Sequence, residues 1–391
     1  MSDTKTLDRE YIAGTYGRFD LELERGKGSL VYSADGKEYI DLGTGIAVNT
    51  FGFCDDAWTE AVKAQLSQLQ HSSNLYYTAP QARLAQMLCE KTGMKKVFFS
   101  NSGAEANECM IKAARKWSHD TYGPDRSTII TLRSSFHGRT ITTLAATGQD
   151  VFHTNFGPFP EGFEYAEPGD LAMAEELLKK GAAAFMLETV QGEGGVRALG
   201  KEYIEGVYAL CRKYGALFCV DEVQTGNGRT GRLYSYMHYD VQPDIVSTAK
   251  GLAGGLPMGA TMFAESTANV LTAGLHGSTF GGNPIAAAGA CSIISRIDGE
   301  LLASVEEKSA YIVSELSGAK GVKGVSGMGF MLGIATEAPA KAIVARLMEK
   351  GVLVLTAKDK VRLLPALNID FELLKKAVSL IKEVIADETP A

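Results

Sequence analysis

Several features that would narrow the class of this 391-residue chain are scarce or missing. Its six cysteines include no Cys-x-x-Cys pair, and no stretch approaches the roughly 20 uninterrupted apolar residues of a membrane span. The charged residues 1–10 contain no apolar core of a secretory signal. We therefore expect no bound metal, no membrane association and a cytoplasmic location in which the thiols stay reduced.

A basic surface and an early dinucleotide motif are missing as well. The net charge is −7, and lysine and arginine are scattered rather than clustered, so we expect no nucleic-acid partner. No Gly-x-Gly-x-x-Gly run stands between an early strand and its helix, because the glycine-rich loops lie elsewhere, as at 226–231. This arrangement disfavours a dinucleotide-dependent oxidoreductase.

What the sequence does contain is the composition of an ordinary globular protein, with 45% hydrophobic and 22% charged residues. Its length favours two domains or one large α/β unit. Short apolar runs alternate with helical patterns, which predicts a mostly parallel sheet covered by helices on both faces. We expect strands near 95–100, 128–132, 184–190, 217–223, 245–248 and 259–264, with helices at 103–117, 171–180 and 201–214.

The two ends of the chain differ from this central region. A hairpin is expected at 30–42, and an amphipathic helix at 371–385 closes the chain. The alanine-rich helix at 284–297 is expected to lead out of the large domain. We therefore predict an N-terminal segment and a C-terminal part that together form a smaller α+β domain beside a large one, with the ranges 1–55, 291–391 and 56–290.

Two charged side chains stand where predicted buried strands end. Asp221 follows the apolar run 217–220, and Lys250 follows the run 244–249. Ligands of open α/β sheets bind at the carboxyl ends of strands, so both residues are expected to face one cleft. Desolvation there would lower the pKa of Lys250 toward ~7–8, as a Schiff-base nucleophile requires. We take these two residues as the expected catalytic pair.

A run of small polar residues, 100–108, joins a predicted strand directly to a helix. Its backbone N–H groups and the positive end of the helix dipole would suit a phosphate, although the run could equally be an ordinary helix cap by Asn101 or Ser102. After another strand, Phe136 could cover the face of a planar cofactor, and Arg139 could bind a carboxylate. The alternatives are a core phenylalanine, a solvated arginine and, for His137 between them, a hydrogen-bonded structural histidine.

Six short runs together carry a family resemblance. In chain order they are 98–108 (FFSNSGAEANE), 136–139 (FHGR), 191–195 (QGEGG), 221–226 (DEVQTG), 247–251 (STAKG) and 277–284 (GSTFGGNP). The chain resembles the class III, fold type I aminotransferases that use pyridoxal 5′-phosphate, from about Tyr16 to Ile385. The resemblance implies a large domain with a mostly parallel seven-stranded sheet and a smaller α+β domain built from both chain ends. Residues 52–56 and Thr189 depart from the family pattern.

The resemblance implies a role for each residue that matches a family motif. Lys250 would form the Schiff base with the cofactor and later move the proton at the substrate carbon, while Asp221 would keep the pyridine nitrogen protonated. The other cofactor-binding residues would be Gln224 at the phenolic oxygen, Phe136 on the ring face, Ser102, Gly103 and Ala104 at the phosphate, and Thr279 at the phosphate of the neighbouring subunit. A homodimer would therefore share its active sites between two chains.

Substrate-binding residues follow from the same resemblance. Arg139 would bind a substrate carboxylate. Glu193 and Arg362 match a pair in which the arginine is masked for the amine donor and freed for a dicarboxylate. Ser278 and Tyr16 complete the expected set, with Tyr16 at the position of a substrate-contacting tyrosine.

Within the family, the chain resembles the members that move the terminal (δ) amino group of N-acetylornithine to 2-oxoglutarate. These form N-acetylglutamate 5-semialdehyde and glutamate in arginine biosynthesis. The similarity lies in the compact length and in residues 45–49 (GIAVN), 228–231 (GRTG) and 362–369 (RLLPALNI). Sibling activities on ornithine, succinylornithine or 4-aminobutyrate remain open, because one or two polar contacts separate such substrates. A non-catalytic binding protein on the same fold is disfavoured because Lys250, Asp221 and Gln224 are all present.

Overall fold

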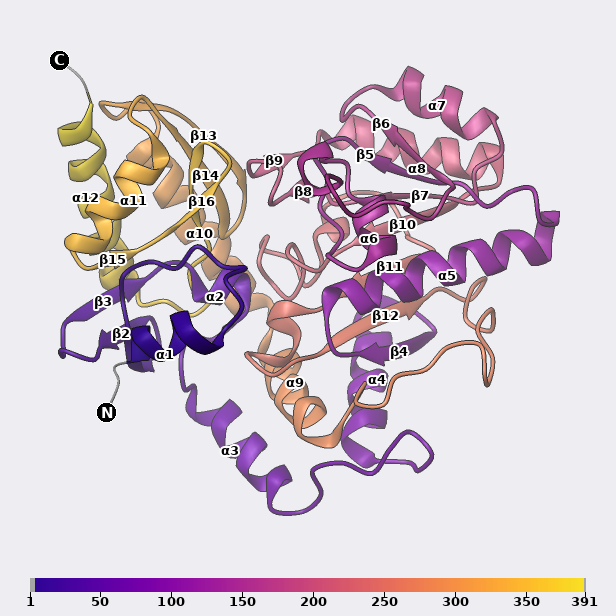
Figure 1. The fold of residues 1–391 in the computed structure, drawn as a ribbon, viewed down its shortest axis with the longest axis horizontal. Coiled ribbons are helices and arrows are strands. Elements are labelled where there is room, and N and C mark those ends of the chain that lie inside the picture. Colours follow the sequence, from indigo (N-terminus) through magenta and orange to yellow (C-terminus); the bar gives the residue numbers. More distant parts are fainter. Residues whose placement is uncertain (1–3, 390–391) are drawn as a thin grey trace.

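The large central sheet organises the molecule. A computed structural model describes residues 4–389, so the outermost residues of the predicted segments 1–55 and 291–391 lie outside the described range. The sheet has seven strands, on the right in Figure 1. Their order is β4 (Lys96–Ser100), β12 (Gly259–Phe263), β11 (Ile245–Thr248), β10 (Leu217–Asp221), β7 (Ala184–Leu187), β5 (Ile129–Leu132) and β6 (Phe163–Ala166). Only β12 runs antiparallel to its neighbours, which confirms the mostly parallel sheet.

Helices cover both faces of this sheet, because successive side chains of a strand point to opposite sides. Phe218 and Val220 of β10 belong to the core under α8 (Lys201–Tyr214) and α4 (Ala79–Thr92), whereas Leu217 and Cys219 pack on the side of α5 (Gly103–Tyr122). Further helices around the sheet are α3 (Asp56–Leu66), α6 (Ile141–Ala146), α7 (Leu171–Lys179) and α9 (Pro284–Arg296). None of the helices within residues 4–389 is long and apolar enough to cross a membrane.

Three details of the sheet differ from expectation. The sequence pattern missed β6, a short edge strand of mixed burial, in which the exposed Glu164 interrupts the apolar run. Strand β7 ends at Leu187, and the residues beyond it form a separate hairpin of β8 (Val190–Gln191) and β9 (Arg197–Ala198). Strand β10 ends at Asp221, two residues before the predicted end, because Glu222 begins a turn.

A second core unites the two ends of the chain. The predicted hairpin forms as β2 (Leu30–Ser33) and β3 (Glu38–Asp41), between β1 (Leu23–Lys27) and the C-terminal β15 (Val352–Leu353). Beside it, β13 (Val322–Met328), β14 (Met331–Thr336), β17 (Lys360–Leu363) and β16 (Leu355–Ala357) form a four-stranded sheet. The helices on this sheet are α10 (Gly299–Leu316), α11 (Ala340–Glu349) and α12 (Phe371–Glu388). Strands from both chain ends thus share one sheet, on the left in Figure 1.

The helix α9 does not leave the large core as expected. Its buried side chains pack with those of the sheet and of α4 as far as Ile293, Ile294 and the following Ile297. The boundaries at 55/56 and 290/291 stay a prediction, and the distribution of buried residues favours placing the second one after residue 297.

Candidate active site

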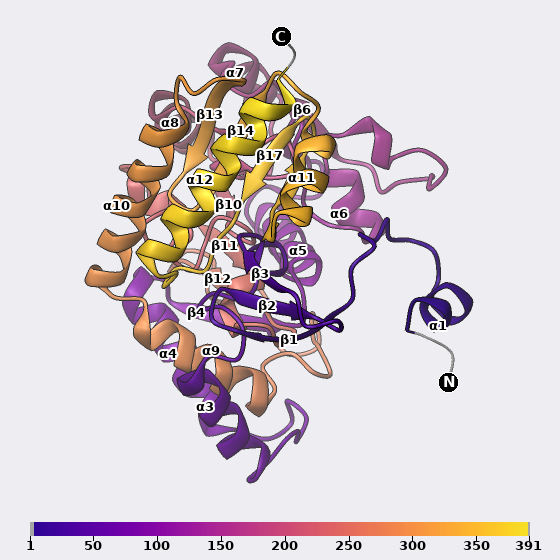
Figure 2. The ribbon, with the colours of Figure 1, turned by 90° about the vertical axis from the view of Figure 1, so that its left-hand side faces the viewer.

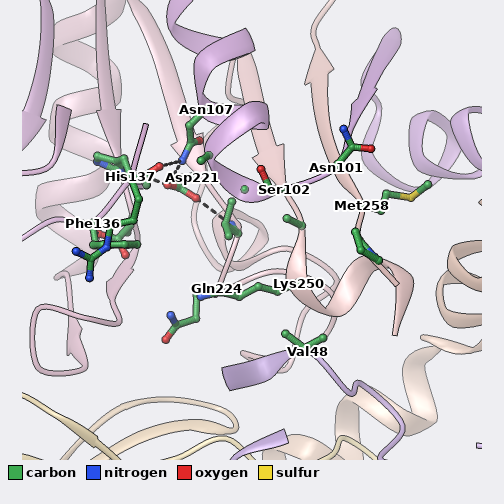
Figure 3. A pocket seen from close by; sticks show the side chains of 18 of the residues that line it. Val48, Asn101, Ser102, Asn107, Phe136, His137, Asp221, Gln224, Lys250 and Met258 are labelled. Carbon is green, nitrogen blue, oxygen red and sulfur yellow. Dashed lines mark hydrogen bonds and ion pairs between the residues drawn. The ribbon is translucent and has the colours of Figure 1, made fainter. Parts of the chain in front are cut away.

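A cavity of about 410 Å³ opens at the carboxyl ends of the parallel strands (Figure 3). The turns after β4, β5, β7, β10 and β11 all reach it, as does the loop that precedes β12. Its lining residues are Val48, Asn101–Ala104, Asn107, Phe136–Arg139, Glu188, Asp221, Val223, Gln224, Ala249, Lys250 and Gly255–Met258. The structure therefore brings together Asp221, Lys250 and the residues predicted around them.

Asp221 is buried and has hydrogen-bond donors at both carboxylate oxygens. Its Oδ2 is 2.7 Å from Asn107 Nδ2 and 2.7 Å from His137 Nδ1, and the backbone N–H of Val223 donates to Oδ1 at 2.9 Å. Ser247 donates in turn to the Asn107 side-chain oxygen at 2.6 Å. These contacts hold the carboxylate in one orientation toward the cavity (Figure 3). His137 is a hydrogen-bonded partner of Asp221, as one of the alternatives proposed from the sequence stated.

Two buried acid–base groups next to Asp221 have shifted pKa values. Burial lowers the pKa of His137, but the hydrogen bond and charge of Asp221 outweigh this effect, so the net pKa is raised. Burial raises the pKa of Glu188 to about 7, even though its Oε2 accepts a hydrogen bond from the backbone N–H of Phe136 at 3.0 Å. Glu188 is thus an acid of near-neutral pKa within the cavity wall.

Lys250 lies directly after β11 with its side chain open to the cavity and otherwise enclosed by protein. Burial lowers the pKa of Lys250 to about 8, although the charge of Glu193 acts in the opposite direction. Its φ of +45° is in the left-handed region, which is costly for a residue with a side chain. The backbone strain and the lowered pKa both mark Lys250 as a functional residue.

The first turn of α5 forms another part of the cavity wall. Ser102 is the N-cap of this helix and accepts a hydrogen bond from the backbone N–H of Glu105 at 3.2 Å. A Cβ at Gly103 would stand 2.6 Å from a methyl group of Val223, so only glycine lets the helix come this close to the turn after β10. Gly103 and Ala104 of this turn line the cavity, and the helix dipole favours an anion at such a helix N-terminus. Ser102 therefore caps the helix, as one interpretation of this run proposed, and the phosphate site stays a prediction.

Phe136 and Arg139 both line the cavity, on the segment that follows β5. The guanidinium of Arg139 lies over the ring of Phe152 at 4.3 Å and near that of Phe136 at 5.5 Å. Arg139 is exposed, and within residues 4–389 no carboxylate pairs with it. It can therefore accept an anionic ligand without first breaking an ion pair.

Arg362 presents the opposite case. It is 3% exposed on β17, and its Nη1 donates to Glu193 Oε1 at 2.6 Å and to Gln224 Oε1 at 3.2 Å. Gln224 also donates to Glu193 at 3.2 Å, so the three side chains form a closed triangle. Burial raises the pKa of Glu193, but the charge and hydrogen bond of Arg362 outweigh this, and the pKa is lowered. A Cβ at Gly192 would come within 2.3 Å of the Gln224 amide, so a glycine is required beside the triangle.

Five predicted residues lie outside the lining of this cavity. Glu193 and Arg362 are connected to it through Gln224, which lines it. Ser278 reaches it indirectly, because its Oγ accepts a hydrogen bond from Asn101 Nδ2 at 3.2 Å. Thr279 lines a separate small hollow near the start of α9, and Tyr16 is 72% exposed beside another cavity of about 370 Å³. The roles of Tyr16 and Thr279 stay predictions.

The sequence interpretation missed three side chains of the site. Asn107 and Ser247 carry the hydrogen-bond chain to Asp221, and Glu188 forms part of the wall. Asn107 is a polar residue on the otherwise apolar buried face of α5, a signal that was available in the sequence. The other two stand at strand ends, where a polar residue is common and carries little information.

Comparison with known proteins gives consistent matches over nearly the whole chain. A family model described as aminotransferase class-III matches residues 11–385. An acetylornithine aminotransferase of Haemophilus ducreyi is 48% identical over 98% of each chain, and other acetylornithine aminotransferases are 40–42% identical. A succinylornithine transaminase of Citrobacter koseri is 42% identical over 95% of this chain and 94% of its own.

Solved structures agree with these sequence matches. An ornithine aminotransferase of Toxoplasma gondii, with partial occupancy of PLP at its active site, superimposes with a TM-score of 0.94. The two proteins are 32% identical, and the match covers 98% of this chain and 94% of the other.

Proposed function

The chain belongs to the class III aminotransferases, and on that premise we propose that it transfers the terminal amino group of N-acetylornithine to 2-oxoglutarate. The products would be N-acetylglutamate 5-semialdehyde and glutamate. The observation that carries this proposal is the contrast between two arginines, the unpaired Arg139 in the cavity lining and the masked Arg362, which bonds Gln224 of that lining. Such a site suits a donor with one carboxylate and an acceptor with two.

The cofactor of this family is pyridoxal 5′-phosphate, and the residues of the cavity fit it. The first turn of α5 offers N–H groups to a phosphate, Asp221 offers a fixed carboxylate, and Lys250 offers an amine of lowered pKa. Ser102, Gly103 and Ala104 would hold the phosphate, Phe136 would cover the ring face, and Gln224 would hydrogen-bond the phenolic oxygen. When bound, the cofactor supplies an electron sink for the carbon that loses its proton.

The protein's own groups would handle the protons. Asp221, held in place by Asn107, His137 and the backbone of Val223, would keep a proton on the pyridine nitrogen. Lys250 would attach the cofactor covalently. Once released, its Nζ would take a proton from the amine-bearing carbon of the substrate, because burial keeps a fraction of this amine neutral near pH 7–8.

The substrate side would work as an exchange of partners. Arg139 would bind the carboxylate of the donor, while Glu193 masks Arg362 and leaves the amine tail without a facing positive charge. With 2-oxoglutarate, Arg362 would leave Glu193 and bind the second carboxylate. Holding the acceptor by two arginines orients the reacting carbon at Lys250.

The nature of the acyl group is the finest part of the proposal. The 48% identity to an acetylornithine aminotransferase supports the acetyl group, whereas the succinylornithine and ornithine relatives keep sibling activities as the alternative. The test is the visible absorbance of the cofactor-loaded protein after adding each donor without an acceptor. We expect N-acetylornithine to convert the cofactor band with the highest kcat/KM. Preference for succinylornithine, ornithine or 4-aminobutyrate would replace the substrate and keep the reaction class.

We also propose a homodimer in which Thr279 completes the neighbouring site. Asn74 bonds the carbonyls of Ser278 and Gly281, so two loops meet at Thr279. Large apolar side chains are exposed on these loops, namely Leu75, Tyr76, Tyr77, Leu275 and Phe280. In addition, α1 (Thr4–Tyr11) has no buried residue and stands apart from the rest of the chain in Figure 2. Sedimentation of the purified protein tests this, since a monomer at micromolar concentration would contradict it.

A cytoplasmic location is the last part of the proposal. All six cysteines lie within the described residues, and none forms a disulfide. Unpaired thiols of this kind are typical of a reducing compartment. Fractionation of the producing cell, with the protein found outside the cytosol, would contradict it.

A further inference from the structure

A second buried arginine lies close to Arg362 and has no part in the mechanism above. Arg229 is 3% exposed in the loop after β10, and its Nη1 donates to the backbone carbonyl of Pro365 and, at 3.5 Å, to that of Phe330. Within residues 4–389 no carboxylate lies within ion-pair distance of it, and burial lowers its pKa to about 9. The charge of buried Asp41 raises this pKa in part, but the Asp41 carboxylate accepts hydrogen bonds from Gly43 and Thr44, so the hydrogen bonds of Arg229 go to carbonyls. Burying a guanidinium on such partners is costly, so a neutral residue would be expected here unless the geometry of its bonds matters.

These bonds connect the two segments that form the triangle around Arg362. Gln224 and Arg229 lie on the loop after β10, whereas Arg362 and Pro365 lie on β17 and its continuation. Arg362 reaches across to the side chain of Gln224, and Arg229 reaches back to the carbonyl of Pro365. The two arginines therefore cross-link the same pair of segments in opposite directions.

These segments pack closely against one another. A Cβ at Gly228 would stand 2.6 Å from a methyl group of Leu367, and one at Gly329 would stand 2.5 Å from the Thr230 backbone. The backbone N–H of Phe330 donates to the Arg229 carbonyl at 2.8 Å. Arg229 thus sits where the loop, the β13–β14 turn and the continuation of β17 meet.

The other end of the continuation is held by the N-terminal part of the chain. Thr44 Oγ1 donates to the Leu364 carbonyl at 2.7 Å, and the Leu367 N–H donates to the Thr50 carbonyl at 2.9 Å. Thr50 also donates to the carbonyl of Gly251, next to Lys250. Residues 364–367 are thus held from two sides, and among the bonds to them named here only that of Arg229 comes from a charged group.

We propose that Arg229 is a positioning residue for Arg362, which keeps the Arg362 guanidinium where the second carboxylate of the acceptor binds. The proposal rests on the proposed function, in which only the acceptor half-reaction uses an unmasked Arg362. Loss of the bond to Pro365 lets residues 362–367 move away from the loop after β10. Displacements of about 1 Å can cost about 100-fold in an oriented site, so the acceptor half-reaction is impaired and the donor half-reaction is not.

The test compares the two half-reactions in Arg229→Lys, which keeps the charge and loses the planar fork. We expect the KM for 2-oxoglutarate and the Kd of glutarate, a dicarboxylate probe measured by calorimetry on the cofactor-loaded protein, to rise at least about tenfold. The rate with N-acetylornithine should stay within about threefold. Arg232→Gln is the matched control, since Arg232 lies in the same loop, is partly exposed and pairs with Glu306; it should change neither value.

Equal losses in both half-reactions, or an unchanged Kd of glutarate, overturn the proposal. If Arg229→Lys does not fold, Thr44→Val removes another bond to the same segment without a buried charge and should raise the same Kd by a smaller factor. Arg362→Gln separates this proposal from the proposed function. If Arg362→Gln leaves glutarate binding intact, the role of Arg362 itself is wrong; if it weakens binding while Arg229→Lys and Thr44→Val do not, only the positioning role fails.

Discussion

The two sides of the cavity are built differently. On the cofactor side, Asp221, Lys250 and the first turn of α5 follow strands β10, β11 and β4 of one sheet, and both carboxylate oxygens of Asp221 have fixed donors. On the substrate side, Arg139 comes from the turn after β5, Glu193 from a separate hairpin and Arg362 from the second core.

This difference indicates which side chains keep their positions when the ligand changes. A group held by a continuous sheet keeps its place whatever ligand arrives, as the constant chemistry of one cofactor requires. A triangle of side chains from three separate segments can open and close. Two substrates of different charge need such an arrangement. Replacing the Glu193 carboxylate at Arg362 by a substrate carboxylate exchanges one buried ion pair for another, at little net cost in free energy.

On the cofactor side, Lys250→Ala should have the largest effect on activity. Without the amine, neither the covalent attachment nor the proton transfer at the substrate carbon can occur, so kcat should fall by about 10⁴-fold or more. Stopped-flow or steady-state turnover with added cofactor measures this. Lys213→Ala, on the surface and paired with Glu175, is the control and should keep full activity. Substantial turnover by Lys250→Ala would remove Lys250 from the mechanism.

Comparing Arg139→Gln with Arg362→Gln tests whether the two arginines of the substrate side bind different carboxylates. A lost charge-assisted hydrogen bond typically costs about 1.5–3 kcal/mol, or roughly 10–150-fold in affinity. Arg139→Gln should raise the KM of both N-acetylornithine and 2-oxoglutarate by this factor, whereas Arg362→Gln should raise only that of 2-oxoglutarate. The measurement is a set of initial rates with each substrate varied in turn. If both variants raise the two KM values equally, the arginines do not have separate roles in binding the two substrates.

A pH series tests the lowered pKa of Lys250 on the cofactor side. With a pKa of about 8, the neutral fraction of this amine rises about tenfold between pH 7 and pH 9, whereas that of an ordinary lysine rises roughly 100-fold. The rate of cofactor uptake by cofactor-free protein should follow the smaller factor. Reaction of the cofactor with N-acetyllysine under the same conditions is the reference. A 100-fold rise in the protein would mean that Lys250 titrates as an exposed lysine.

The smallest expected effect concerns Glu188 in the wall between the two sides. Its folded-state pKa of about 7 lies above the ordinary value of 4.5, so between these pH values the folded protein keeps a proton that the unfolded chain has lost. The free energy of unfolding therefore falls as the pH rises through this window. In Glu188→Gln this fall should be smaller by about 1–2 kcal/mol between pH 5 and pH 8, as measured by urea unfolding of cofactor-free protein. The exposed Glu164→Gln should behave like the parent, and a parallel pH profile for Glu188→Gln would contradict the shifted pKa.

The same difference explains how far the sequence could predict the structure. The ends of buried strands are marked by apolar runs that stop at a polar residue, so Asp221 and Lys250 could be placed at one edge from local pattern alone. The chain from Ser247 through Asn107 to Asp221 could not, because it depends on how α5 lies across the sheet. The contacts of Arg362 depend on how segments far apart in the sequence come together. No local sequence pattern predicts which of these segments lie side by side. Glu193 and Arg362 were identified only through family resemblance.

Strand β12, which runs against its neighbours, has a consequence for how this protein can change over time. Its reversal makes the stretch 249–258 a return connection, which carries Lys250 as its second residue and leads into Gly259 of β12. A Cβ at Gly259 would lie 2.3 Å from the Ser102 carbonyl. Most surface loops tolerate inserted residues, but one added here would push the lysine away from the helix terminus it must face. New substrates can therefore arise by lengthening the outer loops around the arginines, while the length of this connection is as constrained as the identity of the lysine it carries.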